Sequence, residues 1–186
     1  MSTPGTRSRL FVALPLPDEV REPLADYLTR CAELAPEQRW APAANLHLTL
    51  YFLGWVETDA MTRLAEALAE VRRPPFQLQL GGLGRFGTAA RPRVLWVGVE
   101  GGREPLAALA AEVSRVCHRA GVVGDDRPYS PHLTLCRVRS GTRLPGLPEP
   151  VSPPVWKARF FTLFESRPGP RGAVYAPLGE YLLGPH

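Results

Sequence analysis

Short apolar runs alternate with longer amphipathic segments along this chain, a pattern typical of a protein that mixes strands with helices. Apolar or alternating runs predict strands at 9–14, 46–53, 76–80, 93–99 and 133–138, and two more near 155–165 and 173–178. Apolar residues at helical spacing predict three helices, with Asp18 and Thr58 as candidate N-caps of the first two and the third over about 104–120. A proline-rich loop is expected over 142–154.

One strand–helix–strand unit occurs twice in this pattern. The run that begins at Arg9 is followed by a helix and then by His47-Leu-Thr-Leu. The run that begins at Arg93 is likewise followed by a helix and then by His132-Leu-Thr-Leu. If the two copies pack about a pseudo-two-fold axis, equivalent positions face each other. The spacing therefore predicts that the two tetrapeptides flank one groove.

The twin tetrapeptides present the same side chains to one face of a strand. Successive strand residues point to opposite faces, so His47 and Thr49 share one face, and His132 and Thr134 do so in the second copy. The leucines between them face a core. A histidine can act as general acid or general base near neutral pH, and a threonine hydroxyl can donate to a phosphate oxygen. Two of each across a groove suit phosphodiester cleavage without a metal ion.

Two residues beyond the tetrapeptides are harder to place. Phe52 and Arg137 stand five positions after His47 and His132, so strict alternation puts them on the opposite face. A β-bulge or the end of the strand is needed to turn them toward the groove. Cys136 has the spacing to face the groove, but a metal site of His47, His132 and Cys136 is disfavoured, since zinc enzymes commonly use three dedicated protein ligands and two histidines fall short.

Composition narrows the class of protein. The chain has 186 residues, which suits one domain over 9–186 behind a flexible tail of residues 1–8. No apolar run approaches the roughly 20 residues that span a bilayer, and no secretory signal is recognisable. The three cysteines are an odd number and lie far apart in the sequence, which favours reduced thiols in the cytoplasm. The net charge of +4 favours anionic partners weakly, because codon bias also explains why Lys157 is the only lysine among 22 basic residues.

The paired motifs resemble those of the 2H phosphoesterase superfamily. Within it, the order RLFVALPLP, NLHLTLYFLG, RVLWVGV and SPHLTLCRV is similar to the bacterial and archaeal RNA 2′,3′-cyclic phosphodiesterases, also called 2′-5′ RNA ligases. The likeness runs from about residue 9 to residue 178. It implies an α+β fold of two pseudo-symmetric lobes, each a small, mostly antiparallel sheet with flanking helices, and an active-site cleft between the lobes.

The resemblance also implies the reaction and the role of each residue. A terminal 2′,3′-cyclic phosphate of RNA would be hydrolysed to a 2′-phosphomonoester, with no metal or nucleotide cofactor. His47 would be the general acid and His132 the general base. The phosphate would be held by Thr49, Thr134 and Arg137, and a base would stack on Phe52. RNA with cyclic phosphate ends, tRNA fragments among them, is then the expected partner of a monomeric protein. Some relatives also join RNA ends through a 2′-5′ bond, and that activity stays open here.

Two other functions stay open at this point. One is a phosphodiesterase for small cyclic nucleotides or nucleotide adducts, and the other is a module that binds RNA ends without cleaving them. Two titrating groups argue against the second, because binding alone does not need them. Trp96 is expected in the core, and Trp40 either in the core or at the rim of the cleft. Three arginines flank the Gly81–Gly84 segment and either contact RNA or lie on a solvated face: Arg85, Arg91 and Arg93.

Overall fold

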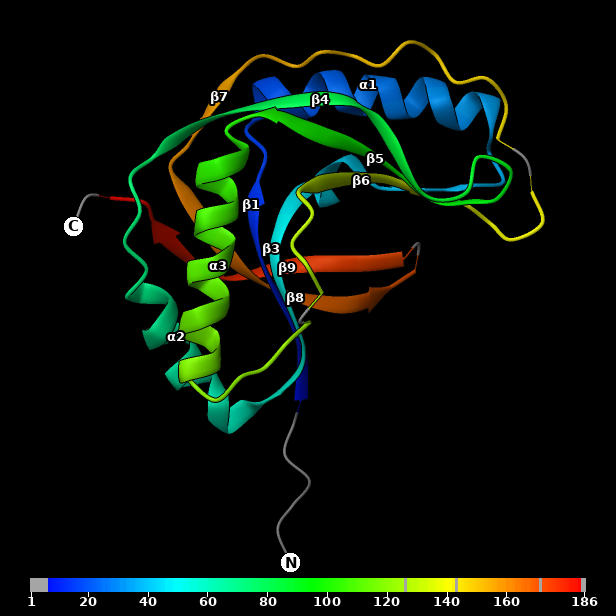
Figure 1. Cartoon of the computed structure of the whole chain (residues 1–186). Coiled ribbons are helices and arrows are strands. Elements are labelled where there is room, and N and C mark those ends of the chain that lie inside the picture. The colour runs from blue at the N-terminus through cyan, green and yellow to red at the C-terminus, as the bar shows by residue number, and fades with distance from the viewer. Residues whose placement is uncertain (1–6, 126, 143, 171, 185–186) are drawn as a thin grey trace, which may run out of the picture.

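Two antiparallel sheets form the framework of the protein (Figure 1). The computed structural model describes residues 7–125, 127–142, 144–170 and 172–184. The first sheet has the order β3-β1-β8-β9, with bounds His47–Glu57, Arg7–Pro15, Phe160–Gly169 and Gly172–Leu182. The second has the order β2-β6-β5-β4-β7, with bounds Arg39–Trp40, His132–Arg137, Pro92–Gly101, Phe76–Gly87 and Trp156–Ala158. The predicted α+β class with two antiparallel sheets is confirmed.

The helices connect the two halves of the fold. They are α1 (Asp18–Leu34), α2 (Met61–Ala69) and α3 (Arg103–Arg119), and 3-10 turns lie at Ala43–Asn45 and Thr58–Ala60. None of the helices in the described ranges is long and apolar enough to cross a bilayer.

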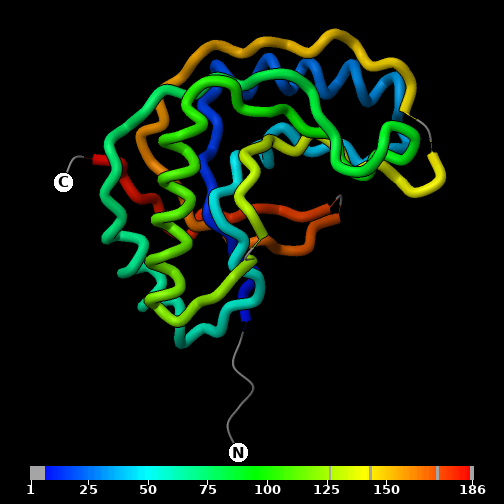
Figure 2. Tube along the Cα trace, in the orientation of Figure 1, coloured from blue at the N-terminus to red at the C-terminus, as the bar shows by residue number. Residues whose placement is uncertain are grey.

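Each long helix packs against the sheet that does not contain the strand before it. Helix α3 follows β5 of the second sheet, yet it lies against β3 of the first (Figure 2). Helix α1 follows β1 of the first sheet, and its fully buried Cys31 lies close enough to Cys136 of β6 to add to the burial that raises the pKa of that thiol to about 12. This exchange joins the two halves through a single apolar core.

The strand and helix starts differ from the expected ones by small amounts. Strand β1 begins at Arg7, so residues 7–8 belong to the sheet and not to a tail, and residues 1–6 of the expected tail lie outside the described residues. Asp18 is the first residue of α1 and not its N-cap, which is Pro17. There the Asp18 carboxylate lies in the first turn, where it favours the helix dipole.

The glycine-rich segment expected to be a bulge or loop is a bulge within β4. Leu80 pairs with Val99 and Leu83 pairs with Val97, so two residues of β4 oppose one of β5. Gly84, which follows, lies beneath the indole of Trp96, and a Cβ built there would be 2.1 Å from Trp96 Cη2. Only glycine leaves room for that ring.

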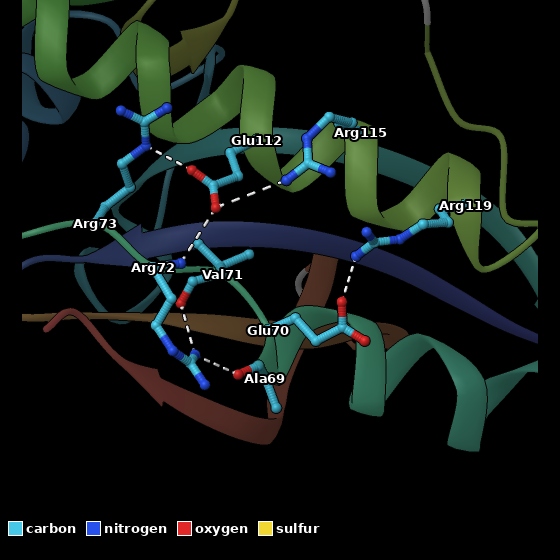
Figure 3. A network of polar contacts seen from close by, with 8 residues as sticks. All are labelled: Ala69, Glu70, Val71, Arg72, Arg73, Glu112, Arg115 and Arg119. Atoms are coloured by element: carbon cyan, nitrogen blue, oxygen red, sulfur yellow. Dashed lines mark hydrogen bonds and ion pairs between the residues drawn. The ribbon is translucent and has the colours of Figure 1, made fainter. Parts of the chain in front are cut away.

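Charged side chains join α2 to α3 at the surface (Figure 3). Glu112 of α3 accepts hydrogen bonds from the backbone N–H of Arg72 at 3.2 Å and from Arg73 Nε at 2.5 Å. Burial opposes ionisation of Glu112, but these bonds and the nearby guanidinium groups hold its pKa below the ordinary value. A second, more exposed ion pair links Glu70 to Arg119. The network fixes the end of α2 against the helix that supports β3.

Candidate active site

The two strands that carry the histidines contain the same bulge at the same position. In β3, Thr49 pairs with Ala13 of β1 and Tyr51 pairs with Val12, so Leu50 is the extra residue. In β6, Thr134 pairs with Trp96 of β5 and Cys136 pairs with Leu95, so Leu135 is the extra residue. The carbonyl of Leu135 accepts the N–H of Ala41 at 2.8 Å instead. The two strands therefore share a detail of backbone geometry as well as the tetrapeptide.

The bulge changes which residues share a face with the histidines. In both strands, the second and fourth residues of the tetrapeptide and the residue after it are buried, and the sixth residue is exposed. Phe52 is 44% exposed, and its ring centroid lies 6.2 Å from that of Phe11, which in turn lies 4.9 Å from that of His47. Phe52 thus lies on the His47 face and Arg137 on the His132 face. Strict alternation would have placed both wrongly.

The same bulge removes Cys136 from the groove. Cys136 is fully buried on the core side of β6, near Cys31 of α1. It cannot complete a metal site with His47 and His132. Among the residues that the structure describes, no group of three His, Cys, Asp or Glu side chains is placed to hold a metal ion.

The two histidine rings are held by equivalent hydrogen bonds. His47 Nδ1 lies 2.6 Å from the carbonyl oxygen of Asn45, and His132 Nδ1 lies 2.7 Å from that of Ser130. A carbonyl oxygen only accepts, so Nδ1 carries a proton in both rings. Nε2 is then the nitrogen that exchanges a proton, as a base when the ring is neutral and as an acid when it is charged. The Asn45 side chain donates to the carbonyl of Ala173 at 2.7 Å, which ties this turn to β9.

Each histidine is bordered by two aromatic rings. Phe11 and Tyr175 lie 4.9 Å and 5.3 Å from His47 between ring centroids. Phe86 and Trp96 lie 4.9 Å and 6.2 Å from His132. The expectation that Trp96 belongs to the core is wrong, because its ring is half-buried on the face of β5 that carries the site. These rings limit the movement of the imidazoles and exclude water from part of their surface.

The two imidazoles act on one another electrostatically. Strands β3 and β6 belong to different sheets but lie next to each other (Figure 1). Burial lowers the pKa of His47, the hydrogen bond to the Asn45 carbonyl raises it, and the charge of His132 lowers it further, with a net downward shift. The influence of His132 shows that the two rings are close enough for the charge of one to affect the ionisation of the other.

Trp40, expected in the core or at the rim, and His118 each have an identifiable contact. The indole N–H of Trp40 donates to the Ala35 carbonyl at 2.9 Å, so this half-buried ring closes the end of α1. His118 is exposed, and its Nε2 lies 2.6 Å from the hydroxyl of Tyr51, on the core side of β3. That hydroxyl also accepts the N–H of Gly124 at 2.8 Å, which attaches the segment before β6 to β3.

Sequence reasoning missed Phe11, Phe86, Tyr175 and the positioning role of Asn45. Alternation in β1 gave no signal for Phe11, because residues 10–14 are apolar on both faces. Tyr175 comes from β9, far from the motifs in the sequence. Trp96 did carry a signal, since Leu95, Val97 and Val99 share the core face and leave Trp96 on the other.

Two neighbouring sheets each carry a His-x-Thr strand, an arrangement that suits paired acid and base chemistry on a phosphate ester. The family model of the 2′-5′ RNA ligase superfamily matches residues 16–156, and the chain belongs to this superfamily.

Relatives with assigned names align over much of the chain. An RNA 2′,3′-cyclic phosphodiesterase from Geobacillus stearothermophilus is 36% identical over 73% of this chain, but the alignment covers only 43% of that relative. The enzyme of the same name from Escherichia coli K12 is 33% identical over 94% of this chain and 96% of its own length. The crystal structure of E. coli LigT complexed with 3′-AMP superposes with a TM-score of 0.79 at 30% identity, over 96% of this chain and 99% of that one.

Proposed function

We propose that the protein hydrolyses the terminal 2′,3′-cyclic phosphate of RNA to a 2′-phosphomonoester. The observation that carries this proposal is the pair of imidazoles with equivalent Nδ1 bonds, each beside a threonine on the same strand face. The names of the aligned relatives support RNA as the substrate. Three free, buried cysteines support a reducing compartment, and we place the protein in the cytoplasm.

Water attacks phosphorus in this reaction, and the bond from phosphorus to the 3′ oxygen breaks. Neutral His132 takes a proton from the attacking water through Nε2, and protonated His47 donates its Nε2 proton to the leaving 3′ oxygen. One proton is taken and one is given, so the protonation states of the two rings are exchanged after each turnover. The hydroxyls of Thr49 and Thr134 donate to the non-bridging oxygens, where charge increases in the transition state.

Arg137 and Phe52 complete the binding of the end of the RNA. The Arg137 guanidinium supplies permanent positive charge on the His132 side of the cleft. The exposed face of Phe52 stacks against a base on the His47 side. The phosphate anion also stabilises charged His47, which offsets the lowering of its pKa in the free protein.

A direct test incubates the protein with an oligonucleotide that ends in a 2′,3′-cyclic phosphate, in the presence of EDTA. Formation of a 2′-phosphomonoester is expected, and the product isomer is identified by its resistance to enzymes that act on 3′-phosphates. Absence of ring opening, with tight binding of the same RNA, would instead support a module that holds RNA ends. A preference for free 2′,3′-cyclic nucleotides over oligonucleotides would support the small-nucleotide alternative. Monomeric state and 2′-5′ ligation stay predictions, which light scattering and an assay with 5′-hydroxyl RNA would test.

A further inference from the structure

Three arginines gather at the edge of the second sheet, beyond the histidines. Arg39 of β2 and Arg137 of β6 are directly paired across the two strands. They line a pocket of about 320 Å³ together with Val138, Arg139 and Ser140. All three arginine side chains are exposed. The pocket therefore presents three guanidinium groups to solvent in one place.

The pairing places Arg39 on the face of the sheet that carries the catalytic groups. Residues directly opposite each other in an antiparallel pair project to the same side, with Cβ atoms about 5 Å apart. Because the bulge at Leu135 turns Arg137 to the His132 face, its partner Arg39 lies on that face too. Arg39 had no assigned role in the sequence.

This charge is not neutralised by ion pairs in the part of the chain that the structure describes. Within the described ranges, none of the three arginines forms an ion pair. Glu37 lies two residues before Arg39 and accepts from the side chain of Gln38 at 2.8 Å, but it forms no ion pair with any of the three. Like charges placed directly opposite on a sheet destabilise it. An anion bound between the guanidinium groups would remove that repulsion.

The cluster extends beyond the reacting phosphate, to which the proposed function already assigns Arg137. Arg137 lies five positions after His132, and at about 3.3 Å per residue this spacing corresponds to on the order of 15 Å along the strand. Strand β2 is the outer strand of its sheet, so Arg39 lies roughly 4.8 Å further out than Arg137. Arg137 ends β6 three residues after Thr134, whereas Arg139 lies beyond the end of the strand and Arg39 lies on the outer strand β2.

We propose that Arg39 and Arg139, next to Arg137, bind an internucleotide phosphate of the RNA chain on the 5′ side of the cyclic end. This subsite would make the enzyme prefer oligonucleotides over mononucleotides, and it rests on the proposed function. Guanidinium groups bind phosphate through paired hydrogen bonds, which suits a backbone phosphate without selecting a base sequence. A mononucleoside cyclic phosphate carries no second phosphate to occupy the pocket.

The test compares a mononucleoside 2′,3′-cyclic phosphate with a trinucleotide that ends in the same group. In the wild-type protein, kcat/KM is expected to be higher for the trinucleotide. The double variant Arg39→Gln/Arg139→Gln should lower the trinucleotide-to-mononucleotide ratio of kcat/KM about tenfold, mainly through KM for the trinucleotide. The matched control is Arg103→Gln/Arg159→Gln, which removes the same charge from exposed sites on α3 and between β7 and β8. The control should keep the wild-type ratio.

A binding measurement separates this proposal from the proposed function. The salt dependence of the affinity for a labelled trinucleotide ending in a 2′-phosphate is measured by fluorescence anisotropy. Loss of this one internucleotide phosphate contact should reduce the slope of log K against log salt by about 0.7, because each neutralised phosphate contributes about 0.7 on a single strand. An unchanged slope and ratio, or an equal loss in the control, would overturn the subsite. If neither substrate is opened by wild-type protein, the proposed function fails, and the binding slope still decides whether the subsite exists. Arg39→Gln alone serves if the double variant does not fold.

Discussion

His47 and His132 are held by the same hydrogen bond, from Nδ1 to the carbonyl oxygen two residues earlier in the chain. The bond leaves Nε2 of each ring as the nitrogen that can exchange a proton. Two rings in the same tautomer can divide acid and base work only if they carry different charges. That difference must come from their surroundings, since their local bonding is equivalent.

Replacing either ring with an amide should abolish most of the turnover. His47→Gln and His132→Gln remove one proton transfer each, and each should lower kcat on the order of 10²–10⁴-fold. Circular dichroism should show an intact fold, because both side chains are half-buried outside the main core. His118→Gln is the matched control, since that ring bonds to Tyr51 on the other side of β3. A loss in the control as large as in the two variants would contradict the assignment.

The pKa of His47 should respond to both its neighbour and its ligand. In the free protein, an NMR titration of the His47 ring should have its midpoint below the ordinary value of 6.5, because burial and the charge of His132 disfavour the protonated form. His132→Gln should raise the midpoint by removing that charge. Inorganic phosphate should raise it as well, since an anion favours the charged ring. A midpoint above 6.5 in the free wild-type protein would contradict the burial of His47 described here.

In the proposed mechanism, the rate depends on protonated His47 as general acid and on neutral His132 as general base. The value of kcat/KM, which reports the free protein, should therefore fall on both sides of an optimum. It falls with rising pH as His47, whose pKa lies below its ordinary value, loses its proton, and with falling pH as the general base can no longer accept one. A profile that is flat from pH 5 to pH 9 would argue against paired acid and base catalysis.

The sequence predicted which strands carry the site, but it did not predict which face of each strand the later residues occupy. Period-two alternation correctly placed His47, Thr49 and the leucines between and after them. It failed at Phe52 and Cys136, since a bulge is a property of pairing with the neighbouring strand and leaves no mark in the tetrapeptide. The family resemblance supplied the facing of Phe52 and Arg137 without the physical reason, which the structure provides.

The aromatic surroundings of the histidines depend on contacts between distant parts of the chain. Tyr175 and Phe86 reach the site from β9 and from β4, and nothing in the local sequence links them to His47 or His132. The exchange of α1 and α3 between the sheets was equally hidden, because an amphipathic helix shows that it packs but not which sheet it covers.

The ring of Phe52 should contribute to binding of the terminal nucleotide. Phe52→Leu keeps an apolar side chain but removes the stacking face, and it should weaken binding by about 5-fold to 150-fold, on the scale of 1–3 kcal/mol per stacked base. The loss should be found in KM for the cyclic-phosphate substrate. Phe52→Tyr retains the ring and should stay close to the wild-type value. Equal effects of the two variants would show that stacking is not what Phe52 supplies.

Gly84 should tolerate a side chain only when Trp96 is made smaller. A Cβ at Gly84 would lie 2.1 Å from Trp96 Cη2, so Gly84→Ala must displace the indole that borders His132. Such overpacking costs about 1–3 kcal/mol, and kcat should fall as the His132 ring loses its support. In the background Trp96→Leu, the additional cost of Gly84→Ala in urea unfolding should largely disappear. Additive effects of the two substitutions would contradict the predicted contact.

Glu112 should stabilise the fold in a pH-dependent way without taking part in the reaction. Its side chain is 11% exposed and accepts from the backbone of Arg72 and from Arg73. Glu112→Gln should lower the free energy of unfolding at pH 7 by roughly 1–2 kcal/mol, discounted because Arg73 is well exposed to solvent. Urea denaturation measures this loss. Glu70→Gln is the matched control, because both partners of the Glu70–Arg119 pair are exposed and the expected loss is much smaller.

The pH dependence of that difference distinguishes an ionic contribution from a packing defect. The folded protein holds the pKa of Glu112 below its ordinary value of 4.5, so the stabilisation is fully present above that value. It is lost as the pH falls through the lower pKa of the folded state, because the protonated carboxyl is then equivalent to the neutral amide. Wild type and Glu112→Gln should therefore converge in stability in acid, while the gap at pH 7 persists. A gap of the same size at pH 3 would mean that shape, and not charge, makes Glu112 important to the contact between α2 and α3.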